Sequence, residues 1–395
     1  MKIGFKTLGC KVNKYESDKI AAILSKKHEI KSKTENLDIC IINTCTVTHI
    51  ADRKSRQAIR QIKQNNPMAK IIVFGCGARK KDNIYIEMPE IDHVFATYDE
   101  VINFLSSDKD IDDFENFNGS RTRVLLKIQD GCDNYCSYCI IPFVRGKATS
   151  YPERRVISEC LAREKQGFKE LVITGVNIGE WKNQEKNLSY LLKKILDNTK
   201  EMRIRISSIE PVHFDDEFYS LFNNPRLCGH VHLSLQSGSN KILEKMRRRY
   251  TTDQYESICN NLRKIRPDIA ITTDLIIGYP GEDESFFNES KLFCEKMKFS
   301  KIHVFKFSSR IGTIAEKLKD IVSDDEKNKR AKIMRDLSVK LEKEFRKNNA
   351  GKEKVVLVES KIGKKRYIGY TDNYIRVEVF SERDVRGEFV VGRIE

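Results

Sequence analysis

The sequence predicts an α/β protein with three parts: a parallel-sheet α/β domain, a partial (β/α)6 barrel and a small antiparallel β-barrel. Three observations lead to this fold class. Strand-like apolar runs alternate with helix-length polar segments, first at short and then at longer spacing. The segment 350–395 contains only strand-like runs and turn residues. At 395 residues, the chain is also too long for one ordinary hydrophobic core.

Residues 1–105 are predicted to form the parallel-sheet domain. Helix-length polar stretches separate its apolar runs, which are "KIGFKTLG", "DICIINT", "KIIVFG" and "IDHVFAT". This alternation is typical of βαβ units. Residues 106–122 are acidic, rich in Asn and Ser and without periodicity, so we interpret them as a linker.

Residues 123–349 are predicted to form the barrel. Six strand-like runs are separated by helix-length segments: "RVLLKIQ", "ELVITG", "RIRISSI", "HVHLSLQ", "DIAITTDLIIG" and "KIHVFKFS". Six units are too few for a closed eight-stranded barrel, so we expect an open one with ligands at the carboxyl ends of its strands. A charged helix from Ser323 to about Asn349 follows, because apolar residues recur there every four positions.

The composition favours a cytoplasmic protein with an anionic partner. Lys and Arg number 72 against 57 Asp and Glu, a net charge of +15, and nucleic acid is the first candidate. The N-terminus lacks the layout of a signal peptide, and no apolar run approaches the ~20 residues that span a membrane. Thiols stay reduced in the cytoplasm, where clustered cysteines are more often metal ligands or nucleophiles than disulfides.

The stretch "DGCDNYCSYCIIPFVRG" places Cys132, Cys136 and Cys139 on one loop after the first barrel strand. We call them the loop triad. Structural zinc usually takes four Cys or His ligands in paired knuckles, and no second knuckle follows here. Three thiolates can instead hold three irons of a four-iron cluster and leave the fourth iron open. A zinc loop or chance clustering remains the alternative.

Three further cysteines, Cys10, Cys45 and Cys76, each follow a different strand-like run of the first domain. We call them the strand triad. If these strands are parallel neighbours, the three thiols converge at the carboxyl edge of the sheet and form a second three-cysteine site. The alternative is three unrelated buried cysteines. We assign no ligand role to the other five: Cys40, Cys160, Cys228, Cys259 and Cys294.

The loop triad matches the pattern CxxxCx(aromatic)C, with Tyr138 as the aromatic residue, and so resembles the radical S-adenosylmethionine (SAM) superfamily. Over essentially its whole length the chain resembles the threonylcarbamoyladenosine tRNA methylthiotransferases. The stretches that carry this resemblance include "TLGCKVNKYES", "NTCTVTHIADRKSRQ", "PFVRG", "ITGVNIG", "HLSLQSGS", "TDLIIGYPGE" and "GYTDNYIRVEV".

The resemblance implies a transferase with two [4Fe-4S] clusters, one on each triad, and SAM as cofactor. It implies a methylthio group installed on the adenine ring of threonylcarbamoyladenosine next to the anticodon, with two SAM molecules used per turnover. Cleavage of SAM would supply a 5′-deoxyadenosyl radical. The resemblance also implies a TRAM-like RNA-binding domain at 350–395 and a tRNA partner. We further expect an electron donor protein such as a flavodoxin or ferredoxin, a monomer, and no catalytic residue beyond the clusters.

Six residues at or near strand ends are candidates for binding SAM. Each also has an ordinary structural role as its alternative, in packing, turns or strand-end hydrogen bonds. They are Tyr138, Gly175, Ser234, Gln236, Gly278 and Glu282.

Basic runs are candidates for contacting RNA, although such runs are usually solvated faces. They are Arg53, Lys54, Arg56 and Arg60 after Cys45, Arg247 to Arg249, and Lys364, Lys365 and Arg366. Their presence together with the net charge fits contact with phosphates and presentation of an unstacked base.

Two other functions remain open. The same methylthiolation could act on isopentenyladenosine in tRNA or on a ribosomal protein. From a different class, the chain could be a non-catalytic RNA-binding protein stabilised by metal.

Overall fold

A five-stranded parallel sheet forms the N-terminal part of the computed structural model, which describes residues 1–80, 83–106 and 122–395. The strand order is β2-β1-β3-β4-β5. The strands are β1 (Lys2–Thr7), β2 (Glu29–Lys31), β3 (Ile39–Thr44), β4 (Lys70–Gly75) and β5 (His93–Val94), and the helices are α1 (Lys11–Leu24), α2 (His49–Asn65) and α3 (Tyr98–Leu105). The predicted parallel sheet is confirmed, with β2 as an additional edge strand. The predicted linker lies almost entirely outside the described residues.

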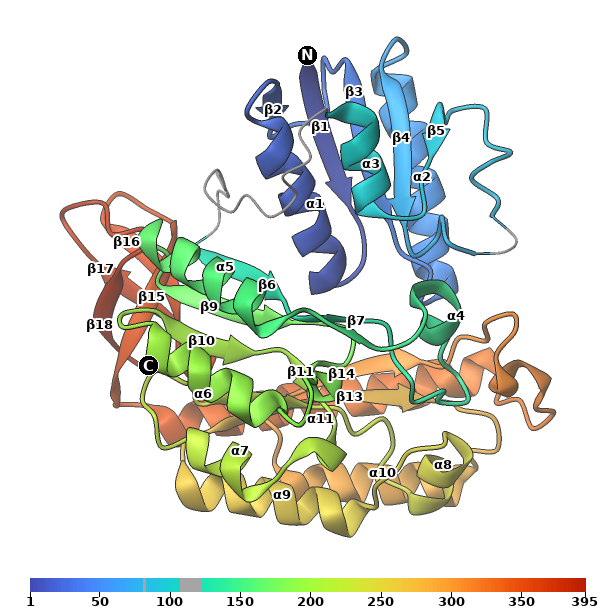
Figure 1. Cartoon of the computed structure of the whole chain (residues 1–395). Coiled ribbons are helices and arrows are strands. Elements are labelled where there is room, and N and C mark those ends of the chain that lie inside the picture. The colour runs from blue at the N-terminus through green and yellow to red at the C-terminus, as the bar shows by residue number, and fades with distance from the viewer. Residues whose placement is uncertain (81–82, 107–121) are drawn as a thin grey trace.

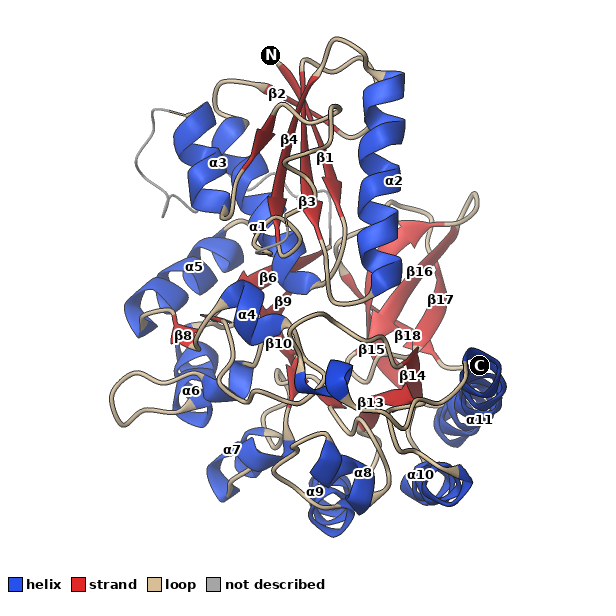
Figure 2. Cartoon of the chain, turned by 90° about the vertical axis from the view of Figure 1, so that its right-hand side faces the viewer, coloured by secondary structure: helices blue, strands red, loops and turns tan. Residues whose placement is uncertain are grey.

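Strand β3 is buried at every position, because helices cover both faces of the sheet. Ile39 and Ile41 pack with residues of α1 and α3, whereas Cys40 and Ile42 pack with residues of α2. Alternate side chains of a strand point to opposite faces, so a central strand with two covered faces is apolar throughout. Figure 2 shows α2 and α3 on opposite sides of the sheet.

The barrel contains six consecutive parallel strands, as predicted. Strands β10 and β11 are two parts of one run that is interrupted at Ser207, and each part pairs in parallel with its neighbour. The strands are β6 (Arg123–Lys127), β9 (Glu170–Thr174), β10 (Arg203–Ile206), β11 (Ser208–Ile209), β12 (His230–Leu233), β13 (Ala270–Ile277) and β14 (Lys301–Lys306). The described part of the chain shows no pairing between β6 and β14, so the barrel is open on that side.

Helices cover the outside of the barrel (Figure 1). The longer ones are α5 (Glu153–Lys165), α6 (Leu188–Asn198), α9 (Thr252–Ile265), α10 (Glu284–Met297) and α11 (Asp324–Asn349). Shorter elements are α4 (Ile141–Arg145), α7 (Asp216–Leu221), α8 (Asn240–Lys245) and the small pair β7 (Gln129–Asp130) and β8 (Thr149–Ser150). The predicted charged helix is confirmed as α11, whose N-cap Ser323 accepts a hydrogen bond from the Glu326 backbone N–H.

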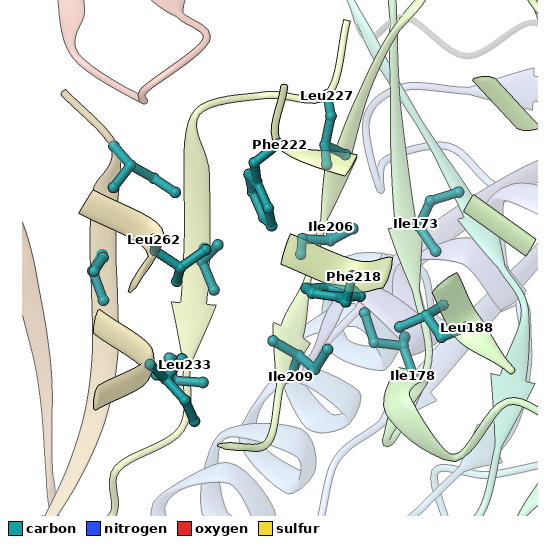
Figure 3. Packing of buried hydrophobic residues seen from close by; sticks show 14 of the residues in the cluster. Ile173, Ile178, Leu188, Ile206, Ile209, Phe218, Phe222, Leu227, Leu233 and Leu262 are labelled. Atoms are coloured by element: carbon teal, nitrogen blue, oxygen red, sulfur yellow. The ribbon is translucent and has the colours of Figure 1, made fainter. Parts of the chain in front are cut away.

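The main hydrophobic core lies between the barrel strands and these helices. In Figure 3, Ile173, Ile206 and Leu233 of the strands pack near Phe218, Leu188 and Leu262 of the helices. Each fully buried side chain of this kind contributes about 1.5–3 kcal/mol through removal of apolar surface from water. Cys160, Cys259 and Cys294 lie in this core and are fully buried, in agreement with their predicted packing role.

The C-terminal part is a four-stranded antiparallel sheet in the order β17-β16-β15-β18. Its strands are β15 (Glu353–Lys361), β16 (Arg366–Thr371), β17 (Arg376–Phe380) and β18 (Phe389–Arg393). The edge strands of this sheet, β17 and β18, do not pair, yet they lie close together: a Cβ on Gly392 of β18 would lie 2.8 Å from Val379 of β17. The sheet is therefore curled. The predicted small barrel is therefore a rolled half-barrel.

The N-terminal domain lies across the open side of the barrel. On one edge, Glu16 of α1 pairs with Lys127 of β6 at 2.8 Å. On the other edge, Arg310, which follows β14, donates to Thr46 at 2.8 Å and pairs with Asp52. The gap between the first and last strands is thus closed by another domain. Among the helices that the structure describes, none is long and apolar enough to cross a membrane.

Candidate functional site

The loop triad lies at the carboxyl edge of the barrel, between β7 and α4. Its loop is fixed by backbone hydrogen bonds from Cys132 N to Gly146 O (3.2 Å) and from Cys139 N to Cys136 O (3.0 Å). Burial raises the pKa of Cys132 and of Cys139 to about 12, and the neighbouring thiols add to this rise. These two thiols are therefore protonated without metal, and iron binding would release their protons.

Arg248 is the polar partner of this triad. Its guanidinium donates to the Cys136 sulfur at 3.2 Å and pairs with Glu210 at 3.0 Å. Sequence reasoning placed Arg248 in a surface basic run, and this is wrong: the side chain is 3% exposed. The Arg248 guanidinium thus gives the Cys136 sulfur a buried hydrogen-bond donor. Three convergent thiols with such a partner fit a cluster with one open iron.

The residues predicted to bind SAM lie in this loop or after the barrel strands β9, β12 and β13. Tyr138 packs against a cluster that includes Met246 and Tyr279. Gly175 follows β9 and allows close approach, since a Cβ there would lie 3.0 Å from the Gln129 carbonyl oxygen. Gln236 has φ +67°, and its backbone joins the neighbouring strand β13.

The three remaining residues of that set have structural partners. The carbonyl of Ser234 accepts from the Tyr250 hydroxyl at 2.7 Å. The Gly278 N–H donates to Glu282 at 2.8 Å, and Arg330 of α11 donates to the same carboxylate oxygen at 3.0 Å. These contacts fit a turn at the end of β13, and a role in SAM binding stays a prediction.

The strand triad converges as the topology predicts. Strands β1, β3 and β4 are adjacent, and a cysteine follows each of them. A Cβ on Gly9 would lie 3.2 Å from the Cys45 sulfur, which shows how closely the segment before Cys10 approaches Cys45. The Asn13 side-chain oxygen lies 3.4 Å from the Cys10 sulfur and 4.0 Å from the Cys76 sulfur.

Cys40 is the contrasting cysteine of this domain. It lies five residues before Cys45 but within β3, fully buried against Ile59 and Ile62 of α2. Within the described ranges, no three Cys, His, Asp or Glu side chains are close enough to hold a single metal ion. A four-iron cluster is larger than one ion, so its ligand thiols stand further apart. The strand triad thus has the donor type and the convergence that a cluster needs.

Arg145 joins the two triads. It lies six residues after Cys139, yet its Nε donates to the Cys76 sulfur at 3.0 Å and its Nη2 to Asn13 at 3.0 Å. Cys76 also packs against Ile140, which precedes α4, and against Val144 within α4. The buried Arg145 side chain therefore bonds to the strand triad, although Arg145 lies in the segment that carries the loop triad.

Arg145 belongs to a buried network of four charges. Arg145 and Lys127 both pair with Glu16 and with Asp130, at 2.6–2.9 Å. Burial alone would raise the pKa values of both carboxyl groups, but the two cations lower them below their ordinary range. Sequence reasoning missed Arg145, Asn13 and Glu16. The only sequence feature that pointed to them was their position within the stretches "CKVNKYE" and "PFVRG", which carry the family resemblance.

Two cavities meet where the three parts of the molecule come together. One, of about 710 Å³, is lined by Cys10, Arg123, Glu359 and Tyr374 among others. The second, of about 510 Å³, lies within the open barrel and is lined by residues such as Arg205, His232 and His303. Lys11, Val172 and Tyr374 line both. The cavity beside Cys10 therefore adjoins the cavity within the barrel.

The predicted RNA-contacting residues differ in their exposure and in whether they already pair with a carboxylate. On α2, Arg53 and Lys54 are exposed, and Arg56 is partly exposed. Arg60 is 3.5 Å from Glu90, Lys365 in the turn before β16 pairs with Glu382, and Arg366 at the start of β16 pairs with Glu378. Lys364 is exposed in that turn. Judged by the residues that the structure describes, the α2 face thus offers more unpaired charge than the turn.

The two triads lie within segments of the chain that match two known protein-family models. The model of an uncharacterized protein family, UPF0004, matches residues 2–96, and the model of the radical SAM superfamily matches residues 126–294. A Bacillus subtilis protein named threonylcarbamoyladenosine tRNA methylthiotransferase MtaB is 35% identical, covering 99% of this chain and 93% of its own length. A Thermotoga maritima protein of the same name is also 35% identical, with coverage of 100% and 94%.

A protein of Thermodesulfovibrio yellowstonii named tRNA-2-methylthio-N(6)-dimethylallyladenosine synthase is 34% identical, covering 95% of this chain and 92% of its own. Among solved structures, the radical SAM methyltransferase TsrM from Kitasatospora setae, with tryptophan and a SAM analogue bound, superposes with a TM-score of 0.56. The two are 14% identical, and the match covers 77% of this chain and 72% of that one. This likeness shows a shared fold.

Proposed function

The chain belongs to the radical SAM threonylcarbamoyladenosine tRNA methylthiotransferases, and we propose that it replaces a ring hydrogen of that modified adenine with a methylthio group. The enzyme is a transferase, and its family implies SAM and a [4Fe-4S] cluster. We assign this cluster to Cys132, Cys136 and Cys139. The finer parts of the proposal are a second [4Fe-4S] cluster on Cys10, Cys45 and Cys76, and the use of two SAM molecules per turnover.

One observation carries the proposal: two groups of three thiols, from separate domains, approach each other around Arg145. When bound, the clusters and SAM supply the radical and the sulfur that replacement of an aromatic C–H requires. Such a reaction needs both reagents at one carbon, so the domains must hold them in fixed geometry. Arg145 and Asn13 fix this geometry, because they bond to thiols and to each other across the domain boundary.

Other residues prepare the site. Arg248 donates a hydrogen bond to the Cys136 sulfur, and Arg310 holds the N-terminal domain against the far edge of the barrel. The covered gap limits water around the reacting carbon, which protects a radical from side reactions. We assign Tyr138, Gly175, Ser234, Gln236, Gly278 and Glu282 to the SAM environment, on the basis of their places around the carboxyl ends of the strands.

We propose a tRNA partner held in part by Arg53, Lys54 and Arg56 of α2, with the C-terminal half-barrel as a second contact through Lys364. The net charge of +15 supports both contacts. The proposal includes an electron donor protein such as a flavodoxin or ferredoxin, a monomeric enzyme and a cytoplasmic location.

The test is the nucleoside content of tRNA from a strain that lacks the gene, measured by mass spectrometry. We expect the methylthio form of threonylcarbamoyladenosine to disappear, and restoration of the gene to return it. Loss of methylthio-isopentenyladenosine in its place would assign the enzyme to the substrate of its dimethylallyladenosine relatives. No change in either nucleoside would contradict tRNA methylthiolation.

A further inference from the structure

We propose that Lys11 binds the threonyl carboxylate of the substrate base and thereby selects threonylcarbamoyladenosine over adenines with an uncharged substituent. This inference rests on the proposed function and concerns a residue beyond the cluster ligands. Its basis is the position of Lys11, the state of the other cations around the cavities, and the chemistry of the substituent.

Lys11 is placed where the substrate must lie. It is the first residue of α1 and follows Cys10 directly. Its side chain is exposed, and it lines both the cavity beside Cys10 and the cavity within the barrel. A base whose ring is held at the strand triad would therefore have its substituent near Lys11.

Most cations that line these cavities already have partners. Arg123 pairs with Glu359, Lys14 with Asp18 and Lys301 with Glu342, while Arg205 pairs with Glu170 and Arg346 donates to a carbonyl. Lys11, by contrast, makes no side-chain ion pair or hydrogen bond within residues 1–80, 83–106 and 122–395. Arg376 is unpaired over the same ranges, but it lies on β17 and lines only the barrel cavity.

The titratable groups that act electrostatically on Lys11 are Asp274, Cys10, Arg123 and Arg205. Asp274 lies 3.2 Å from the His232 ring nitrogen and is not within ion-pair distance of Lys11. Arg123 pairs with Glu359, and Arg205 shares Glu170 with Arg203. Within the described residues, Lys11 is thus the cation beside Cys10 that an incoming carboxylate meets without an ion-pair partner.

The substituent of the base supplies the matching group. A threonylcarbamoyl group ends in the free carboxylate of threonine, whereas a dimethylallyl group is a hydrocarbon. A charge-assisted hydrogen bond to an ammonium forms with the first and is lost with the second. A site built for a polar group discriminates strongly against an analogue that lacks it.

The experiment measures binding without turnover. Anaerobically reconstituted holoenzyme is titrated, without reductant, with anticodon stem–loops that carry either threonylcarbamoyladenosine or plain adenosine, and fluorescence anisotropy gives the ratio of the two affinities. We expect Lys11→Gln to lower this ratio by about tenfold or more, with little change for the plain adenosine loop. Lys11→Arg should keep most of the ratio, because the cation remains.

Lys14→Gln is the matched control: it removes the same charge one turn later on α1, from a lysine that already pairs with Asp18. It should leave the ratio unchanged. Equal loss for both loops in Lys11→Gln would mean a phosphate contact and would overturn the inference. So would an unchanged ratio, or a loss in Lys11→Arg as large as in Lys11→Gln. Iron content equal to that of the wild type shows that the neighbouring Cys10 site is intact.

Failure of the proposed function can be told apart from failure of the inference about Lys11. If the wild-type enzyme forms no methylthiolated product from tRNA that contains threonylcarbamoyladenosine, the proposed function is wrong whatever the binding ratio. If it does form product and Lys11→Gln retains the full binding preference, only the role of Lys11 is wrong.

Discussion

Each triad brings three thiols together, but the two are assembled in different ways. The loop triad is built within eight residues, so a short loop sets its geometry, and its pattern is visible in the sequence. The strand triad is assembled from the ends of β1, β3 and β4, so its geometry depends on the register of a whole sheet. A local site tolerates changes elsewhere in the fold, whereas a dispersed site depends on the elements that bring its parts together.

Removal of the loop triad should have the largest effect. Cys132→Ala, Cys136→Ala or Cys139→Ala should abolish formation of 5′-deoxyadenosine, because the iron that binds SAM is lost. The strand triad belongs to another domain and should keep its iron, so iron content should fall by about half. Liquid chromatography of quenched reactions measures the nucleoside. Normal 5′-deoxyadenosine production by any of the three variants would contradict the assignment.

Removal of the strand triad should stop product formation but leave SAM cleavage intact. Cys10→Ala, Cys45→Ala or Cys76→Ala should lower iron content by about half and yield no methylthiolated tRNA, while 5′-deoxyadenosine still forms.

Cys40→Ala is the control for this set, because Cys40 lies within β3 and packs against α2. It should keep iron and activity at some cost in stability. Loss of the cluster in Cys40→Ala together with its retention in Cys45→Ala would show that the strand triad is wrongly assigned.

The link between the triads can be broken at Arg145. Arg145→Met leaves Glu16 and Asp130 with one cation instead of two, and removal of one partner from a buried ion network costs about 3–5 kcal/mol. We expect a lower midpoint of urea denaturation and a smaller yield of methylthiolated tRNA. Arg145→Met combined with Glu16→Gln should recover part of the midpoint. An unchanged midpoint in Arg145→Met would mean that the network does not hold the domains together.

Acid should weaken the same network. The pKa values of Glu16 and Asp130 are lowered in the folded protein, so their ionised forms stabilise it above about pH 4, the range of the unfolded groups. This contribution is lost as the pH falls through their folded pKa values. Glu16→Gln should therefore flatten the decline of stability below about pH 4, as followed by thermal unfolding.

The smallest effects are expected at the RNA-contacting surface. Arg53→Ala and Lys54→Ala should each weaken tRNA binding and reduce its salt dependence by about one counterion, because both are exposed on α2, the helix that follows Cys45. Lys365→Ala should have less effect, since that lysine already pairs with Glu382. Filter binding between 50 and 200 mM salt measures both. A salt-independent affinity of the wild type would argue against phosphate contacts.

The sequence predicted what depends on periodicity and short spacing. The alternation of apolar runs predicted both parallel sheets, and the CxxxCxxC spacing predicted the loop triad. The convergence of Cys10, Cys45 and Cys76 followed from strand topology. The partners Arg145 and Arg248 could not be predicted, because each contacts a sulfur more than sixty residues away in the chain. A run such as "RRR" reads as surface charge until the fold shows which arginine turns inward.

The central claim is that two separate three-cysteine sites each hold a four-iron cluster, and anaerobic iron and acid-labile sulfide analysis tests it most directly. The wild-type protein should contain about eight irons per chain, and the triple variant of either triad about four. The variant that lacks all six cysteines should contain none. About four irons in the wild type, or zinc in place of iron at the strand triad, would contradict the claim.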